Sequence, residues 1–275
     1  MHIQPNQTLI VGGTGKTGRR VTQRFQARGL PVRVAARSVA PGFDWADPSS
    51  WPALLSQVHA VYLAYHPDLA LPEAADQISA FSKLALESGV RRIVLLSGRG
   101  EKGAQASEQG VRNSGAAFTI LRAAWFCQNF SEGHLLEPVQ RGQIRLPAAN
   151  VAEPFVDAED IADVAFAALT EDAHTGVTYE LTGPRLLTFA EAAAEIARAA
   201  EREVTYVPLS SERYRAELAA QFPAEIAQFL TELFQEVLDG RNAYLGDGVQ
   251  RALGRRPRDF SDYARTAAAS GVWSQ

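Results

Sequence analysis

The stretch Thr8-Leu9-Ile10-Val11-Gly12-Gly13-Thr14-Gly15-Lys16-Thr17-Gly18-Arg19-Arg20 decides how the rest of this 275-residue chain is interpreted. It joins a short apolar run, a glycine-rich turn and the start of a helix. An apolar run of this kind is typical of a buried strand. The three spaced glycines allow, in order, a tight turn, close approach of a ligand to the backbone, and close packing of the helix on the sheet.

Two classes of ligand compete for this loop. Its free backbone N–H groups and the positive end of the helix converge on one point, which suits a pyrophosphate. Gly15-Lys16-Thr17 is also similar to the end of a nucleoside-triphosphate loop, but that pattern requires glycine where this chain has Ile10. We therefore favour a dinucleotide over a triphosphate, with a purely structural glycine turn as the third interpretation.

The composition is that of an ordinary globular protein, with 46% hydrophobic and 21% charged residues and a formal net charge of −4. This charge gives no general attraction to nucleic acid or to an anionic membrane. The apolar runs are too short to span a bilayer, and residues 1–8 lack the order of a secretory signal. The single cysteine, Cys127, is consistent with a reducing compartment. We expect a cytoplasmic protein with no nucleic-acid or membrane partner.

Strands and helices alternate at short intervals through the first half of the chain. The predicted strands are 8–11, 32–36, 43–48, 60–64, 91–97 and 117–121. The strand 91–97 is nearly all apolar, as expected for a strand buried on both faces. This alternation predicts an α/β fold with a doubly wound parallel sheet, the Rossmann arrangement.

The residue after the second predicted strand, Arg37, indicates the type of dinucleotide. NAD-preferring folds usually place Asp or Glu here to bind the ribose 2′-hydroxyl. A carboxylate would repel a 2′-phosphate, whereas Arg37 would attract one. We therefore predict NADP(H) rather than NAD(H). The alternatives are that Arg37 is a solvated side chain at a strand end, and that Arg33, within the strand, takes this role.

Two further segments are expected beside the ligand. In this topology Asp44 and Trp45 pass near the adenine, which Asp44 could bind and Trp45 could cover; a surface hydrophobe and a helix cap are the alternative. The aromatic-rich residues after the strand 117–121, including Trp125 and Phe126, should line the mouth of the site.

The apolar face of the segment 222–237 is compatible with core, with a lid over a substrate or with an oligomer surface, and we favour core. A homodimer is compatible with the sequence. No metal site is predicted, because the histidines show neither i, i+4 spacing nor a nearby cysteine set. The histidines are His2, His59, His66, His134 and His174.

Several motifs follow one another in an order that is more specific than any one of them. They are Gly12-Gly13-Thr14-Gly15-Lys16-Thr17-Gly18, Ser97-Gly98, Thr119-Ile120-Leu121-Arg122 with Phe126 and Asn129-Phe130, Phe155-Val156-Asp157-x-x-Asp160-Ile161-Ala162, and Tyr179-x-Leu181-Thr182-Gly183-Pro184. In this order and spacing the chain resembles the NmrA-like group of atypical short-chain dehydrogenases/reductases over nearly its whole length. The resemblance implies an NAD(P)-binding Rossmann domain, here 1–150 with a helix near 158–170 packing back on it. It also implies a smaller C-terminal α/β substrate domain, mostly 151–275.

The resemblance also implies where a dinucleotide would bind. Its phosphates would contact Gly12, Thr14, Gly15, Lys16, Thr17 and Gly18. Arg37 would take the 2′-phosphate. Ala64 and Tyr65 would line the path from adenine to nicotinamide, and Ser97 and Gly98 would lie near the nicotinamide ribose. Asn129 would face the nicotinamide or the substrate.

One feature departs from ordinary short-chain dehydrogenases, which use Tyr-x-x-x-Lys to transfer a proton. The residues four before Lys16, Lys83 and Lys102 are Gly12, Ser79 and Gly98, so this chain has no such relay. Its absence favours hydride acceptors that need no strong acid, namely an iminium, a quinone or a conjugated cation.

We therefore expect an NADPH-dependent reductase of a small apolar or aromatic molecule, with the cofactor supplying the chemistry. Tyr65, Trp125, Phe126 and Asn129 would hold the substrate. Ser97 would act as a polarising hydroxyl, and Asn129 would assist at the reacting centre. The alternatives are a non-catalytic dinucleotide sensor that binds a partner protein and an epimerase-like or lyase enzyme, which the missing tyrosine disfavours.

Overall fold

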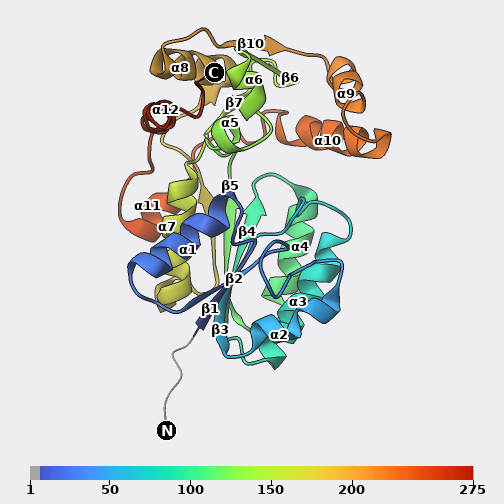
Figure 1. Cartoon of the computed structure of the whole chain (residues 1–275), viewed down its shortest axis with the longest axis vertical. Helices are drawn as coiled ribbons and strands as arrows, with labels where there is room; N and C mark the ends of the chain where they lie inside the picture. Colours follow the sequence, from blue (N-terminus) through green and yellow to red (C-terminus); the bar gives the residue numbers. More distant parts are fainter. Residues whose placement is uncertain (1–6, 275) are drawn as a thin grey trace.

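The computed structural model describes residues 7–274 and divides into two lobes (Figure 1). The lower one, called here the sheet lobe, is a six-stranded sheet in the order β2-β1-β3-β4-β5-β8 between two layers of helices. Its strands are β1 (Gln7–Val11), β2 (Val32–Ala35), β3 (Val58–Leu63), β4 (Arg92–Gly98), β5 (Ala117–Ala123) and β8 (Val177–Leu181). All adjacent strands are parallel, so the doubly wound parallel sheet predicted from the sequence is confirmed.

The strand order reverses at β1, which lies between β2 and β3. In an open parallel sheet, ligands bind outside the carboxyl ends of the strands at such a reversal. Ile10 and Val11 of β1 are fully buried, so the loop that follows is fixed at its first residue to a rigid strand. The sheet therefore places the glycine-rich loop at the position where a ligand is expected.

The two faces of the sheet are covered by different helices. α1 (Lys16–Ala27), α7 (Ala158–Thr170) and α11 (Gly248–Leu253) cover one face, and α2 (Pro52–Leu55), α3 (Ala74–Glu87) and α4 (Lys102–Arg112) cover the other. Side chains of β1 alternate between these layers, as strand geometry requires. Ile10 packs in the cluster that contains Phe25 of α1, while Leu9 and Val11 pack in the cluster that contains Phe81 of α3.

The strand predicted at 43–48 is wrong: these residues form a loop that ends in the short 3₁₀ helix η1 (Pro48–Ser50). Side chains and local backbone turns, not a ladder with a neighbouring strand, bond its backbone groups. Trp51 Nε1 donates to the Asp44 carbonyl oxygen at 2.8 Å, and the Ser50 hydroxyl accepts from the Asp44 amide at 3.3 Å. Pro48 has no N–H to offer to a ladder. The sixth strand of the sheet is instead β8, which comes from much later in the chain.

The second, smaller lobe is called here the cap lobe and lies beyond the carboxyl ends of the strands (Figure 1). Its elements are α5 (Asn129–Glu132), α6 (Leu136–Gln140), β6 (Gln143–Leu146), β7 (Ala152–Glu153), β9 (Leu187–Thr188), α8 (Phe189–Ala200), β10 (Thr205–Pro208), α9 (Ser211–Ala219), α10 (Ala224–Val237) and α12 (Phe260–Ala269). Phe130, Phe155, Phe189 and Phe260 form the centre of its own core.

The chain passes between the lobes repeatedly. It enters the cap lobe after β5, returns for α7 and β8, leaves again after β8, returns once more for α11, and ends in the cap lobe with α12. The division at residue 150 stays a prediction, but α7 and β8, beyond that residue, belong to the layers of the sheet lobe. Within residues 7–274, no helix has both the length and the apolar character needed to cross a membrane.

Candidate active site

A cleft of about 740 Å³ runs along the carboxyl ends of β1, β2 and β3. Nearly all residues predicted to bind a dinucleotide line it. They are Gly12, Thr14, Gly15, Lys16, Thr17, Arg37, Asp44, Trp45, Ala64 and Tyr65. The structure therefore brings these side chains and backbone groups together in one wall, while their contacts with a ligand stay a prediction.

The glycine-rich loop leaves space where a side chain would otherwise lie. Gly12 has φ +74°, and a Cβ there would meet the Ala64 carbonyl oxygen at 2.9 Å. A Cβ on Gly18 would collide with the Gly12 carbonyl oxygen, so Gly18 is needed for close packing of α1 and lies outside the cleft wall. Apart from its chain neighbours, the described atom within 4 Å of a Cβ at Gly15 would be the Gly12 carbonyl oxygen, at 3.2 Å, which is a tight contact.

The N-terminus of α1 is open to a ligand. Gly15 provides no side-chain cap, and the first turn has no acidic residue. The first backbone N–H groups of a helix lack partners within it and carry partial positive charge. An anion at this end of α1 would therefore find unused donors.

Two cations of the cleft remain available to such an anion. Arg37 is exposed and makes no hydrogen bond or ion pair to any residue in 7–274. Lys16 is partly buried, and this burial lowers the pKa of its ammonium group. Arg33, the alternative to Arg37, instead donates to the carbonyl oxygens of Leu54 and Ser56 at 2.6 and 3.0 Å. Because backbone carbonyl groups already hold its guanidinium, Arg33 is a poorer candidate than Arg37 for binding a 2′-phosphate.

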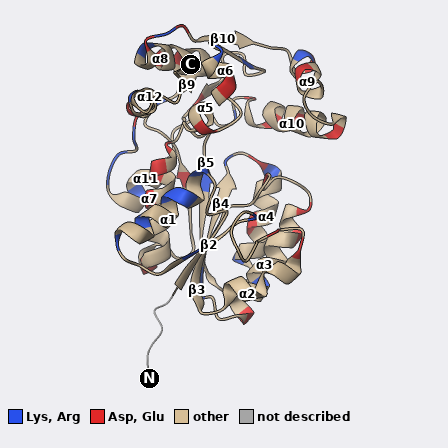
Figure 2. Cartoon of the chain, in the orientation of Figure 1, with Lys and Arg blue, Asp and Glu red and all other residues tan. Residues whose placement is uncertain are grey.

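The other arginines near the loop are already paired. Arg20 bonds Glu132 and Glu159 at 2.7 and 2.6 Å, and Arg24 bonds Glu159 at 2.8 Å. These pairs join α1 to α5 and α7. Figure 2 shows basic and acidic segments interspersed over both lobes in this view. Free positive charge in the cleft therefore comes from Lys16 and Arg37.

The far end of the cleft is aromatic. The ring of Trp45 is mostly buried and lies 4.9 Å, centroid to centroid, from that of Tyr65. The Tyr65 hydroxyl donates to Gln77 Oε1 at 2.6 Å, and burial raises the pKa of Tyr65 to about 12. The Asp44 carboxylate accepts from the Ala46 amide at 3.0 Å, so it caps a local turn. Adenine contacts by Asp44 and Trp45 stay a prediction.

A second cavity of about 340 Å³, called here the chamber, lies between the lobes and adjoins the cleft. The two cavities share Lys16, Tyr65, Pro67, Leu96 and Phe126. The residues predicted to hold the substrate all line the chamber; they are Tyr65, Trp125, Phe126 and Asn129. Ser97 and Gly98 line it as well. The cleft and the chamber thus form one continuous site.

The wall of the chamber on the cap lobe is apolar. The Trp125 ring packs edge-on against Phe189 and Phe234, with centroids 5.2 Å apart in each case. Leu233, Phe234 and Val237 of α10 also line the chamber. The prediction that the apolar face of 222–237 is core is therefore only partly right. Its last turns cover the chamber, whereas Phe222 and Ile226 are 44% and 45% exposed.

The hydroxyl of Ser97 is already engaged. It donates to Glu108 Oε1 at 2.8 Å, and Glu108 is fully buried and held by Arg122 through two hydrogen bonds of 2.7 Å. A polarising role for Ser97 stays a prediction, and this hydrogen bond weighs against it. Asn129, at the start of α5, lines the chamber, and its side-chain amide has no hydrogen bond to the described part of the chain.

The acidic groups in the chamber wall were not among the predicted site residues. Glu101 follows β4, and its pKa is raised to about 8 by burial and then by the charges of Asp68 and Glu236. Glu153 of β7 is fully buried, and neither of its carboxyl oxygens has a hydrogen-bond partner. Burial raises the pKa of Glu153 to about 7, against the opposing effect of Arg99.

His134 also lines the chamber. Desolvation by neighbouring protein atoms, and then the charge of Lys16, lower the pKa of His134 to about 4 although the residue is exposed, so it is neutral at neutral pH. Isolated Glu and His residues at these positions carry no local pattern, which explains why sequence reasoning missed them. No group of three metal-ligating side chains occurs in residues 7–274, and His2 lies outside them.

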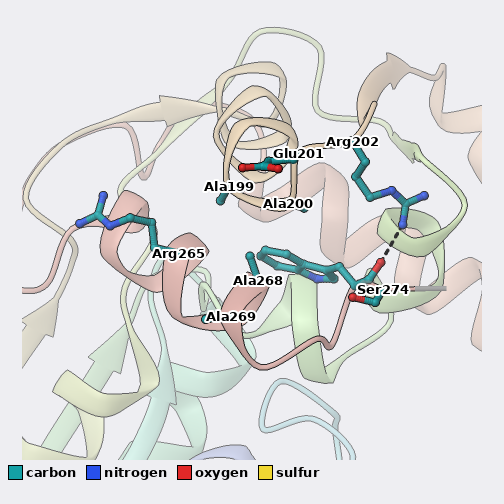
Figure 3. Close-up of a pocket in the computed structure, with 9 residues that line it drawn as sticks. Ala199, Ala200, Glu201, Arg202, Arg265, Ala268, Ala269 and Ser274 are labelled. Carbon is teal, nitrogen blue, oxygen red and sulfur yellow. Dashed lines mark hydrogen bonds between the residues drawn. The ribbon is translucent and has the colours of Figure 1, made fainter.

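A further hollow of about 530 Å³ lies between α8 and α12, near the C-terminus (Figure 3). None of the predicted site residues lines it. Arg202 donates to the Trp273 carbonyl oxygen at 2.8 Å across it, and the Trp273 indole donates to the Phe130 carbonyl oxygen at 2.8 Å. These bonds fasten the last residues to the cap lobe, so we interpret the hollow as part of that attachment.

Comparisons with known proteins show what the chain is similar to. The sequence model of the NmrA-like family matches residues 105–264. The chain is 32% identical to the uncharacterized oxidoreductase YesF of Bacillus subtilis (strain 168), over 99% of this chain and 100% of that protein. It is 28% identical to the NAD(P)H azoreductase of Xenophilus azovorans, over 95% and 98% of the two chains.

One solved structure is similar over nearly the whole molecule. It is the triphenylmethane reductase of Citrobacter sp. complexed with NADP(H), with a TM-score of 0.74 over 95% of this chain and 99% of that chain. The two sequences are 20% identical, so this likeness shows the fold alone.

Proposed function

The chain belongs to the NmrA-like family, and from that premise we propose that it is an NADPH-dependent reductase of apolar or aromatic small molecules. The acceptor would be an iminium, a quinone or a conjugated cation. The observation that carries the proposal is the continuity of a cation-bearing cleft with an aromatic chamber through Lys16, Tyr65 and Phe126. A cavity of about 300–1,000 Å³ is the usual size for a small-molecule site.

The residues of the cleft fit a dinucleotide. The glycine loop leaves a cradle that a Cβ at Gly15 would fill, and α1 offers its uncapped N-terminus to a diphosphate. Arg37 has no partner in residues 7–274 and would bind a 2′-phosphate, which favours NADP(H) over NAD(H). Names of relatives point the same way, since one is an NAD(P)H azoreductase and one was crystallised with NADP(H).

When bound, NADPH supplies a hydride to the acceptor. The chain's own residues would place the acceptor and exclude water. Trp125 and Phe126 offer flat apolar surfaces for an aromatic substrate, and Asn129 offers an amide that is free to bond it. α10 would close the chamber above them through Leu233 and Phe234. A reducing, cytoplasmic location is part of the proposal and rests on the sole cysteine, Cys127, which is buried.

The experiment that tests the proposal is direct. Purified protein is mixed with NADPH and a panel of quinones, cyclic imines and cationic dyes, and the absorbance of the reduced cofactor is followed. Turnover of any acceptor supports the reductase. Tight NADP(H) binding without turnover across the panel would instead support a dinucleotide sensor that signals to a partner protein. Absence of binding would contradict both.

A further inference from the structure

Glu101 has an unusual position in the chamber wall. It directly precedes α4 but does not cap it with its side chain. Its carboxyl group lies instead over Gly98, at the carboxyl end of β4, so that a Cβ on Gly98 would collide with it. Within residues 7–274, Glu101 makes no side-chain hydrogen bond or ion pair, although it is largely surrounded by protein.

The groups that face Glu101 come from three other segments. Asp68, in the loop after β3, accepts from the Ala70 amide at 2.8 Å. Glu236 of α10 pairs with Arg241 at 3.0 Å, and Arg241 also donates to the Gly100 carbonyl oxygen at 3.2 Å. Arg241 is thus shared between Glu236, Asp239 and the Gly100 carbonyl oxygen, and no residue within 7–274 forms an ion pair with Glu101 or Asp68. Burial and these two charges together raise the pKa of Glu101 to about 8, so it holds its proton at neutral pH.

The other proton-bearing groups of the chamber are committed or closed off. The Ser97 hydroxyl donates a hydrogen bond to Glu108, and the Tyr65 hydroxyl donates one to Gln77. The carboxyl oxygens of Glu153 are inaccessible to solvent. Lys16 begins α1 beside the glycine loop, where the proposed function uses it to hold a phosphate. His134 has its pKa lowered to about 4, so it is neutral at neutral pH, and the Asp68 carboxyl group accepts from the Ala70 amide. Among the side chains that line the chamber, Glu101 is left as the acid that can give a substrate a proton.

We propose that Glu101 is the catalytic acid of the chamber and gives a proton to neutral acceptors such as quinones and cyclic imines; this rests on the proposed function. In the step, the acceptor takes a hydride from the reduced cofactor and so gains two electrons. The O–H bond of Glu101 breaks as a new O–H or N–H bond forms on the acceptor. Glu101 is left as a carboxylate, which recovers its proton from water.

This assignment divides the acceptors into two groups. A quinone or an imine gains a proton as well as a hydride, and so needs Glu101. A preformed conjugated cation is neutralised by hydride alone, and so does not. Glu101 thus takes the place of the absent Tyr-x-x-x-Lys relay for one group of substrates only.

The test compares a naphthoquinone with a cationic triphenylmethane dye in the wild type and in Glu101→Gln. Removal of a general acid typically lowers the rate by about 10²–10⁴-fold, so we expect a quinone rate at least about a hundredfold lower. The dye rate should stay within about threefold. Glu232→Gln, which removes an exposed carboxyl from α10, is the matched control and should change neither rate.

The pH profile gives a second result. With the wild type, the quinone rate should fall as the pH rises past about 8, because Glu101 loses its proton there, while the dye rate should not. This fall in the quinone rate at high pH should be absent in Glu101→Gln. The acid role would be overturned if the variant lost both rates equally, lost none of the quinone rate, or still showed the fall at high pH.

A measurement that needs no turnover completes the test. The infrared difference between wild type and Glu101→Gln should contain the C=O band of a protonated carboxyl near neutral pH, and this band should vanish at higher pH. A missing band overturns the assignment, whatever the enzyme reduces. A wild type that shows the band and reduces neither acceptor would instead overturn the proposed function, and the proton step with it.

Discussion

The cleft and the chamber are built in different ways. Residues 12 and 14–17 of one contiguous loop line the floor of the cleft, and Arg37, shortly after β2, lies beside them. The chamber is assembled from side chains that follow β3, β4 and β5 and from side chains of α10 and β7. One site therefore depends on local geometry, and the other on how two lobes pack together.

Their charges differ in the same way. Within residues 7–274, Lys16 and Arg37 of the cleft form no ion pair. In the chamber wall Glu101 and Glu153 form none either, although the charge of Arg99 acts on Glu153. A polyanion is attracted to the first, and a neutral acceptor that must gain a proton is suited to the second. Dinucleotide binding in the cleft and acceptor binding in the chamber should therefore be separately adjustable, and the following variants test this separation.

The largest effect is expected for Gly15→Val. A Cβ at Gly15 would lie 3.2 Å from the Gly12 carbonyl oxygen, which a shift of a few tenths of an ångström in the loop relieves, and its backbone is extended with φ −78°, so the variant should fold. The added methyl groups would occupy the position of the diphosphate and remove several charge-assisted hydrogen bonds of about 1.5–3 kcal/mol each. NADPH affinity, measured by calorimetry, should fall more than about a thousandfold.

The control for this variant is Gly42→Val, where a Cβ would meet only the Arg37 carbonyl oxygen, at 3.7 Å. It should retain NADPH binding. If Gly15→Val also retained it, the cleft would not be a dinucleotide site.

Glu153→Gln tests how much the buried carboxyl group of Glu153 lowers the free energy of unfolding. Burial raises the pKa of Glu153 from its usual 4.5 to about 7, so folded protein keeps a proton that unfolded protein loses between these values. Stability therefore falls as the pH rises from about 4.5 to about 7, and the deficit persists above it. The variant should be more stable than wild type by roughly 3 kcal/mol at pH 8 and about equally stable at pH 4.

Urea denaturation at the two pH values measures this, with Glu232→Gln again as the exposed control. Parallel stability curves for wild type and Glu153→Gln would show that Glu153 is ionised in the folded protein.

Arg37→Glu tests the other end of the cleft. It replaces an unpaired cation with an anion at the expected 2′-phosphate, so the preference for NADP over NAD should fall by about a hundredfold. Calorimetry with both dinucleotides gives this ratio. Arg91→Glu, an exposed change before β4 at the opposite end of the sheet, should leave the ratio unaltered. An unchanged ratio in Arg37→Glu would refute the 2′-phosphate assignment.

The smallest effect is expected for Leu233→Trp. A larger side chain on α10 would fill part of the chamber without reaching the cleft, since Leu233 lines only the former. The KM for an aromatic acceptor should rise by about tenfold, which corresponds to about 1.4 kcal/mol, while NADPH affinity stays constant. Leu30→Trp, at an exposed site, is the control. Parallel losses of both affinities would show that the two cavities are not independent.

The same contrast explains what could be predicted from the sequence. The glycine loop, Arg37 and the segment around Trp125 follow strands directly, so local spacing was enough to place the loop and Arg37 in the cleft and Trp125 in the chamber. Glu101 and Glu153 gain their character only from burial beside distant segments, which no short pattern encodes. The strand expected at 43–48 failed because the side chains of Ser50 and Trp51 take up its backbone groups.

The route of the chain between the lobes has a consequence for how acceptor choice can change. Because the cap lobe is made from several separate stretches, with α7, β8 and α11 returning to the sheet lobe between them, it cannot be exchanged with that of a relative at a single junction. A graft would have to carry every stretch at once. New specificities in such a molecule should therefore arise by point substitutions around the chamber rather than by recombination of whole modules.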